Sequence, residues 1–415
     1  MATANKGVQE RGGAWRILRH RDYRLLWFGQ LVSSGGSQMQ VVATAWLVYE
    51  LTGSAVQLGL LGLLRAIPVM ALSMVGGTFA DTLDRRKVLL VTQSILMSLA
   101  AILAITTWTG VISMPLIYTI TVLAGATNSF DNPARSALIP NLVPREELAG
   151  ALTLNVTTFQ LAQIVGPTVG GFIVAAAGAQ GAYAIDAISF AAVLAALLLM
   201  RTTLSIPAEA RPAHQRGIGA LLEGFIFVRR NSLIFSVMML DFLATLFGTV
   251  QSLLPVYAKD VLHVDASGLG LLYAATSAGA MGAALVLSAR GRIQSQGLTL
   301  LVAVALFGLS LVGFGLSNIF WLSLLFLAGE GAADTVSMVL RGAILQLATP
   351  DELRGRTTAV HMTFAMGGPQ LGQLRGGLLA GWIGPAGAVV SGGLAVIAIV
   401  AGMAALVPKI RLYRL

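Results

Sequence analysis

The chain contains no cysteine, only four histidines, and charged residues at just 11% of its 415 positions. Without cysteine it cannot form disulfides, thiolate metal sites or iron–sulfur clusters. The histidines are scattered along the sequence, so they predict no metal site. The sequence shows neither a phosphate-binding loop of the form G-x-x-x-x-G-K-[ST] nor a set of nucleophile and base. We therefore expect no cofactor, no nucleotide as energy source and no enzymatic activity.

Apolar sequence dominates instead: 56% of the residues are hydrophobic, and the mean hydropathy is +0.80. A bilayer core of about 30 Å requires roughly 20 apolar residues as a helix, and stretches of that length recur throughout the chain. Backbone polar groups in lipid must be satisfied within the segment, so the spans are helical. The sequence predicts an all-α, polytopic membrane protein with twelve transmembrane helices. The expected spans are 24–50, 55–80, 88–108, 114–138, 149–177, 181–200, 232–258, 265–289, 298–317, 319–345, 356–384 and 386–408.

Basic residues predict the orientation of these spans, because they gather on the cytoplasmic side of membrane proteins. If both termini are cytoplasmic, 24 of the 27 Lys and Arg residues lie on that side. The exceptions are Lys259, in an outer loop, and Arg65 and Arg375, which fall within spans. We expect a multi-pass protein of the plasma membrane, in bacteria the inner membrane. The net charge of +9 follows from this asymmetry and requires no nucleic-acid partner.

An internal repeat divides the chain. The segment RSALIPNLVPREELAG at 135–150 returns as RGAILQLATPDELRG at 341–355, displaced by 341 − 135 = 206 residues. Between the two halves, a stretch with proline and glycine leads into an amphipathic segment at 221–230, which we expect at the inner membrane surface. The expected organisation is an N-terminal six-helix half at 1–200, a cytoplasmic linker at 201–230 and a C-terminal six-helix half at 231–415.

A dense charged segment, GTFADTLDRRK at 77–87, separates the second and third spans. With twelve spans, two parallel halves and this loop, the chain resembles the major facilitator superfamily of secondary transporters over essentially its whole length. The segment is similar to the superfamily's loop motif of glycine, aspartate, glycine and paired basic residues. Asp84 stands where that motif usually has glycine.

A second motif lies in the fifth span, where the sequence GPTVGG contains Gly166, Pro167, Gly170 and Gly171. It is similar to the glycine–proline motif of exporters in the superfamily, although an upstream glycine often found there is missing. The order of segments, including FDNPAR at 130–135, resembles the subgroup that contains the bacterial enterobactin exporter and related drug-efflux proteins. The resemblance therefore implies export.

The resemblance also implies a latch at the cytoplasmic side, which holds that side closed in the outward-open state. It implies Asp81 as the partner of a helix end across the halves, Arg85 as the latch and Asp131 as the acid that Arg85 meets. A direct substrate or proton role for Asp131 is the alternative. The expected latch residues are Gly77, Asp81, Asp84, Arg85, Arg86, Asp131 and Arg135.

Polar residues recur at helical spacing inside the first, fourth, seventh and tenth spans. The superfamily places these four spans around its central cavity, so the pattern agrees with the resemblance. Arg65, near the middle of the second span, needs an acid such as Asp241 or Glu330, or an anionic group on the substrate, as a partner. The candidates for the substrate cavity are Gln30, Ser34, Gln38, Arg65, Asn128, Thr245 and Thr249.

Three acids in the C-terminal half are candidates for proton coupling: Glu330, Asp241 and Asp334. Glu330 and Asp241 lie near mid-membrane, where a carboxylate is costly to ionise and can load and release a proton as access alternates. Asp334, one turn from Glu330, either shares that proton or forms an ion pair with Arg341, which we favour.

These features predict a proton-coupled exporter, an antiporter that moves an amphipathic organic compound such as a drug-like molecule or a siderophore. An importer or facilitator of the same fold is one alternative, and a membrane sensor or scaffold without transport is another. The expected partners are a small-molecule substrate and the lipid bilayer, and no long outer domain points to an obligate protein partner.

Overall fold

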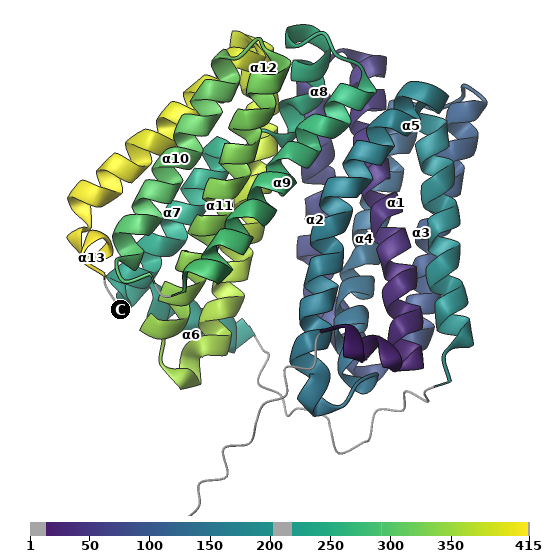
Figure 1. The fold of residues 1–415 in the computed structure, drawn as a ribbon, viewed down its shortest axis with the longest axis horizontal. Helices are drawn as coiled ribbons and strands as arrows, with labels where there is room; N and C mark the ends of the chain where they lie inside the picture. The colour runs from purple at the N-terminus through teal and green to yellow at the C-terminus, as the bar shows by residue number, and fades with distance from the viewer. Residues whose placement is uncertain (1–13, 202–217, 292, 414–415) are drawn as a thin grey trace, which may run out of the picture.

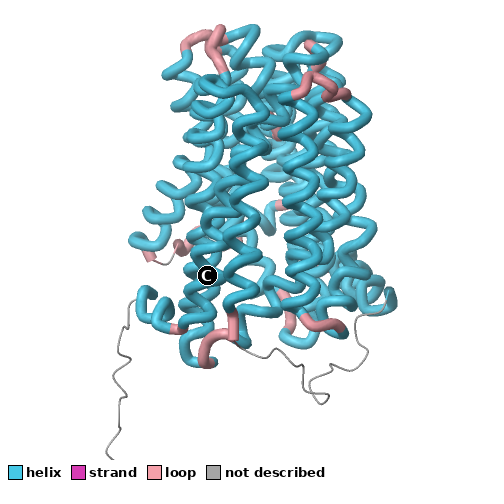
Figure 2. Tube along the Cα trace, turned by 90° about the vertical axis from the view of Figure 1, so that its right-hand side faces the viewer, coloured by secondary structure: helices cyan, strands magenta, loops and turns pink. Residues whose placement is uncertain are grey.

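The structure, a computed structural model, describes residues 14–201, 218–291 and 293–413. Figure 2 shows that the regular elements in these ranges are helices, with loops at the two ends of the bundle, and no described residue is in a strand. After a short 3₁₀ helix at Ala14–Arg19, the N-terminal half consists of α1 (Arg21–Thr52), α2 (Ala55–Thr82), α3 (Arg85–Trp108), α4 (Met114–Leu138) and α5 (Leu148–Leu199), with 3₁₀ turns at Ile139–Asn141 and Arg145–Glu147.

The C-terminal half is also helical. It consists of α6 (Ile218–Arg230), α7 (Ser232–Gly248), a 3₁₀ turn at Gln251–Leu253, α8 (Leu254–Val256), a π-helical turn at Tyr257–Val261, α9 (Ala266–Arg290), α10 (Gln296–Leu316), α11 (Phe320–Ala348), a 3₁₀ turn at Asp351–Leu353, α12 (Arg354–Leu406) and α13 (Pro408–Arg411). The amphipathic helix α6 packs on α12 and α7. Its Glu223 forms an ion pair with Arg356 of α12 at 2.5 Å.

Two of the helices each contain two membrane spans. α5 turns at Gly178 (φ 73°) and α12 turns at Gly384 (φ 77°), in the left-handed region where glycine has no steric penalty. The two breaks are 384 − 178 = 206 residues apart, the same displacement as the sequence repeat. Eight stretches are long and apolar enough to cross a membrane. With α5 and α12 counted twice and the less apolar α1 and α4 added, the described residues give the twelve predicted spans.

The predicted span 232–258 is wrong as one continuous helix. α7 ends at Gly248, and Thr249 is extended (φ −69°, ψ 122°). Short helical turns then continue the crossing to Val261. Pro255 lies in the first turn of α8, where its missing N–H costs no hydrogen bond and its fixed φ suits the start of a new helix.

Two bundles form the molecule, one from each half, and their ribbons meet near one end and diverge toward the other (Figure 1). We call the end with the connections 83–84, 139–147, 291–295 and 349–353 the basic face, and the other end the opposite face. The halves touch through α5 with α9 and through α12 with α2. A Cβ atom on Gly171 would lie 2.4 Å from the Ala266 backbone oxygen, and one on Gly377 would lie 2.5 Å from that of Ala55. These contacts lie near the opposite face and require glycine.

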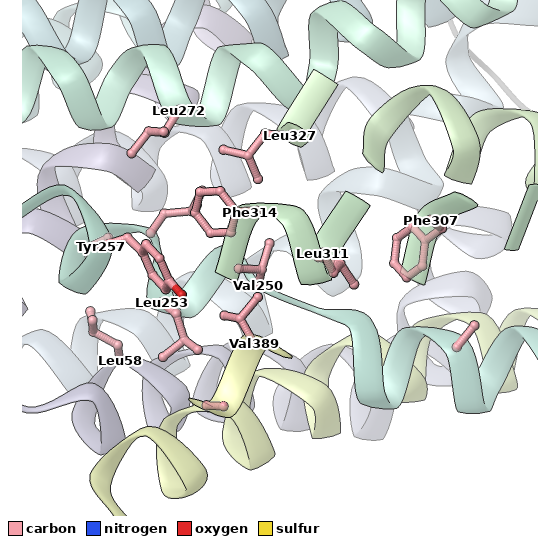
Figure 3. Close-up of a cluster of buried hydrophobic side chains, with 14 of the residues drawn as sticks. Leu58, Val250, Leu253, Tyr257, Leu272, Phe307, Leu311, Phe314, Leu327 and Val389 are labelled. Atoms are coloured by element: carbon pink, nitrogen blue, oxygen red, sulfur yellow. The ribbon is translucent and has the colours of Figure 1, made fainter. Parts of the chain in front are cut away.

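Apolar packing continues from the C-terminal half into α2 of the N-terminal half (Figure 3). Tyr257 and Phe314 are fully buried, with ring centroids 4.5 Å apart. The Tyr257 hydroxyl donates to the Gly315 carbonyl at 3.1 Å, which satisfies its polar end. Leu58 of α2 belongs to the same cluster. The opposite face is thus held together by both small-residue contacts and buried apolar side chains.

We expect Gly171→Val to shift the two halves apart at the opposite face, because the added side chain would overlap the α9 backbone. The absence of native cysteine allows spin labels at Thr109 and Asn318, which are exposed near that face on different halves. Pulsed electron spin resonance should show a longer distance as the main population. Gly282→Val is the control, since a Cβ there has no atom within 4 Å. Equal distances in both variants would contradict the role of this contact.

Candidate functional site

Three helices of the C-terminal half meet at a buried ionic cluster. Asp241 of α7 accepts an ion-paired hydrogen bond from Arg341 of α11, with 2.7 Å between Oδ1 and Nη1. Arg341 Nη1 also lies 3.3 Å from Ser337 Oγ. His361 of α12 places Nε2 3.8 Å from Asp241 Oδ2, and neither of these two atoms has a hydrogen-bond partner. The carboxylate therefore lies between a fixed cation and a group that becomes a cation when protonated.

The expected ion pair between Asp334 and Arg341 is wrong, because the carboxylate in contact with Arg341 is that of Asp241. The helix geometry explains the difference. Residues seven apart are separated by about 10 Å along a helix axis. Asp241 instead approaches Arg341 sideways from a neighbouring helix. Asp334 remains close enough for its charge to interact with both Arg341 and Asp241.

Glu330 lies where α11 packs against α9, and its side chain is buried. The Thr276 side chain lies beside its carboxyl group, and the carboxyl oxygen Oε2 has no hydrogen-bond partner. The helices approach closely here, since a Cβ on Gly331 would lie 2.0 Å from the Thr276 backbone oxygen. A neutral carboxylic acid fits this environment better than a carboxylate, which would require more donors.

Glu330, Asp334, Ser337 and Arg341 follow one another at helical spacing on α11. Together with Asp241 and His361 they form a strip of titratable or polar groups, which we call the α11 strip. It runs from the middle of α11 toward the basic face. The predicted proton-coupling residues Glu330, Asp241 and Asp334 all belong to this strip.

The predicted cavity residues do not converge in the same way. Thr245 and Thr249 lie against α12, where a Cβ on Gly368 would be 2.2 Å from Thr245 Oγ1, and both hydroxyls donate to backbone oxygens of their own helix. Gln38 packs against Gly166 of α5. The remaining candidates, Gln30, Ser34 and Asn128, are half-buried, and the Asn128 amide donates to the Ala124 carbonyl at 2.8 Å.

Arg65 is exposed, and no ion pair with Asp241 or Glu330 forms in this conformation among the described residues. The expected ion pair of Arg65 with one of these acids is therefore wrong for this conformation, since Asp241 is paired with Arg341 instead. An exposed arginine in a membrane span is tolerated only beside water or an anion.

Asp131, one of the predicted latch residues, is fully buried and lies in a polar network within the N-terminal half. Asp131 Oδ1 accepts hydrogen bonds from Thr92 and Gln93 of α3, both at 2.8 Å, and its ion-pair partner is Arg135. Arg85 donates to the Ala137 carbonyl at 2.7 Å. In this conformation Asp131 forms its ion pair with Arg135, and not with Arg85 as the resemblance implies. The hydrogen bonds from Thr92 and Gln93 still attach the end of α4 to α3.

Other latch residues hold the start of α3. The Asp84 side chain caps this helix by accepting from the Arg86 backbone N–H at 3.0 Å, and Arg86 Nη2 donates to the Leu198 carbonyl at 3.1 Å. An N-cap role explains an aspartate where the loop motif usually has glycine. The surroundings of Gly77 and Asp81, the remaining latch residues, lie outside what the structure describes.

The glycine–proline motif serves close packing. Gly166 and Gly170 lie against Gly35 and Met39 of α1, and Gly171 lies against α9. These contacts leave no room for a larger side chain at any of the three positions. Pro167 is inside α5 and buried between them.

Two titratable side chains that could take part in proton chemistry were not among the residues predicted from the sequence. His361 belongs to the ionic cluster, and the position of a titratable side chain inside a predicted span was the signal that could have identified it. Asp186 was assigned no role from the sequence, and its side chain is fully buried.

Arg375, to which no role was assigned from the sequence, lies beside the end of α7. Its guanidinium is 5.0 Å from the centre of the Phe247 ring, and Nη2 donates to the Ala388 carbonyl at 3.4 Å. A cation near a helix C-terminus is favourable because the free carbonyl groups there are partly negative. Arg375 therefore stabilises the interruption between α7 and α8.

Comparison with known proteins extends these observations. The family described as transmembrane secretion effectors matches residues 12–412. The enterobactin exporter EntS of Citrobacter koseri is 29% identical over 90% of this chain and 89% of its own. The enterobactin exporter EntS of Shigella boydii is 29% identical over 92% of this chain and 91% of its own.

Solved structures share the fold. A bacterial homologue of the human lysosomal transporter Spinster, inward-facing and unoccupied, has a TM-score of 0.71 at 13% identity and covers 95% of this chain and 96% of its own. A bacterial homologue of the iron transporter ferroportin, also inward-facing, has a TM-score of 0.65 at 14% identity, covering 92% and 99%. The match over nearly the whole sequence, on a fold of two six-helix halves, shows that this chain belongs to the transmembrane secretion effectors of the major facilitator superfamily, which are transporters and not enzymes.

Proposed function

We propose that the protein exports an amphipathic organic molecule, of the siderophore or drug-like class, in exchange for protons. The names of its relatives support export of a siderophore, since both EntS proteins are enterobactin exporters. The α11 strip supports proton coupling. It is the observation that carries the proposal, because buried acids in a membrane span are costly and characteristic of proton pathways.

The basic face is the cytoplasmic face in this proposal, with both termini on that side of the inner membrane. The division into a first half at 1–200, a linker at 201–230 and a second half at 231–415 is part of the same proposal. Within the linker, residues 202–217 lie outside the described residues. The packing of α6 on α12 and α7 suits a segment at the inner surface that attaches to the second half.

With this orientation the structure is in an inward-facing state. The contacts that join the halves at Gly171 and Gly377 lie near the outer face. There the Tyr49 hydroxyl of α1 also donates to the Asp260 carboxylate of the other half, and Lys259 lies 6.0 Å from the Tyr49 ring centre. An exposed Arg65 in α2 suits a water-filled path from the cytoplasm that receives an anionic substrate group.

Proton exchange follows from the groups of the α11 strip. A proton that reaches this cluster can bind to the Asp241 carboxylate, which would weaken the ion pair between Asp241 and Arg341. Glu330 carries the proton deeper in the membrane. Alternation between the two faces, with rocking of the halves about the central region, then couples proton entry to substrate exit. The latch residues around Asp131 act on the cytoplasmic side of this cycle.

Transport in proteoliposomes of known protein orientation tests the proposal. Under an imposed pH gradient, we expect a catecholate siderophore or a lipophilic cation to move outward while protons move inward. Vesicles without protein are the control for leakage. Proton-driven accumulation on the cytoplasmic side would show an importer, and flux that ignores the gradient would show a facilitator; either result would contradict proton-coupled export.

A further inference from the structure

A buried carboxylic acid lies in the N-terminal half, apart from the α11 strip. Asp186, in the second span of α5, is 0% exposed. It faces the middle of α1, where a Cβ on Gly36 would lie 2.8 Å from Asp186 Oδ1 and 2.4 Å from Ser189 Oγ. Glycine at position 36 thus makes room for the carboxyl group and its neighbouring hydroxyl.

The hydrogen bonds around Asp186 are too few for a charged carboxylate. Ser37 Oγ and Ser189 Oγ both lie 3.4 Å from Oδ1, and Oδ2 has no partner. The Ser189 hydroxyl already donates its hydrogen to the Asp186 backbone oxygen at 2.7 Å. Only the Ser37 hydroxyl is left as a donor, at a long distance. An ionised carboxylate has about four acceptor positions to satisfy, so this arrangement leaves most of them empty.

Within the part of the chain that the structure describes, no positive charge is paired with Asp186. The parts of α1 and α3 that cross the membrane beside it, 25–48 and 88–108, contain no charged residue. Tyr183, one turn earlier on α5, is the nearest titratable residue in the sequence, and its hydroxyl is engaged with Thr44 Oγ1 at 3.1 Å. Among the described residues Asp186 has no ion pair. An unpaired carboxylate in this position would be strongly unfavourable.

We propose that Asp186 is a second proton-binding site, which holds its proton in the inward-facing state. The protonated carboxyl can donate its O–H to Ser189 Oγ, which is free to accept because its own hydrogen points to the backbone carbonyl. Ser37 is adjacent to Gln38 and Ser34 on α1, a helix proposed to line the substrate path. A movement of α1 that admits water to Asp186 would favour release of the proton. Each half would then carry its own proton site.

Infrared spectroscopy of the full-length protein in lipid nanodiscs tests this site without a transport assay. At neutral pH, the difference between wild type and Asp186→Asn should contain a protonated-carboxyl C=O band that shifts in D₂O. Asp265→Asn is the matched control. Asp265 is exposed before the first residue of α9, which it caps, and the hydrogen bond from Ser267 lowers the pKa of its carboxyl, so its replacement should leave that band unchanged. Asparagine also retains the helix-capping function.

A second variant keeps the proposal testable if Asp186→Asn does not fold. Ser37→Ala removes a hydrogen-bonding neighbour but not the acid, so it should shift the frequency of the band and retain it. Loss of an ionised-carboxylate band in Asp186→Asn would overturn the proposal. So would a protonated band that disappears when NaCl replaces choline chloride, because the site would then bind a cation. The result does not depend on export, so failure here and failure of the proposed function are distinguishable.

Discussion

Glu330→Gln is expected to abolish proton-driven export while the protein still folds and binds its substrate. Glutamine has nearly the same size as glutamate and can keep the contact with the Thr276 side chain. It cannot carry a proton. Glu330 has no ion pair among the described residues, so the substitution leaves no buried charge without its partner. Accumulation under an imposed pH gradient should fall to the level of vesicles without protein.

Glu223→Gln is the matched control, because this exposed glutamate on α6 forms its ion pair with Arg356 at the basic face, outside the α11 strip. It should transport like wild type. Exchange of labelled for unlabelled substrate without a gradient measures the steps of transport that need no proton coupling. We expect Glu330→Gln to retain this exchange. Gradient-driven accumulation at the wild-type rate in Glu330→Gln would make this residue structural.

Arg341→Ala should cause the largest loss of stability among single substitutions in the α11 strip. Arg341 and Asp241 are 8% and 2% exposed, and they form an ion pair at 2.7 Å. Removal of one partner of a buried pair costs roughly 3 to 5 kcal/mol, because the other charge remains buried and uncompensated. Thermal unfolding in detergent, followed by tryptophan fluorescence, should show a clearly lower midpoint, and transport should be lost.

The double variant Asp241→Asn/Arg341→Ala distinguishes an unpaired charge from lost packing. It should recover most of the stability, since no carboxylate remains, and it should still be unable to couple protons to transport. Arg354→Ala is the surface control. Its pair with Asp351 is exposed, so the change should be less than about 1 kcal/mol. Wild-type stability of Arg341→Ala alone would show that Asp241 is not charged in this state.

Much of the fold could be predicted because each span carries its own signal. The length of an apolar run sets whether it crosses the bilayer, and turns such as Gly178 and Gly384 separate adjacent spans. The repeat at Arg135 and Arg341 predicted two related halves, which the equal displacement of the two glycine turns confirms. The interruption after Gly248 was missed because Pro255 lies several residues beyond the point where the helix ends.

The sequence by itself determined that this protein is a two-part helical membrane transporter, since hydropathy, glycine turns and the loop motif act within one helix or between neighbouring helices. It also placed Glu330, Asp334 and Arg341 on one face of α11. Only the tertiary structure decided that Arg341 pairs with Asp241, that His361 joins them and that Asp186 is buried. These contacts join helices far apart in the sequence, and side-chain spacing along one helix contains no information about which residue a neighbouring helix brings to it.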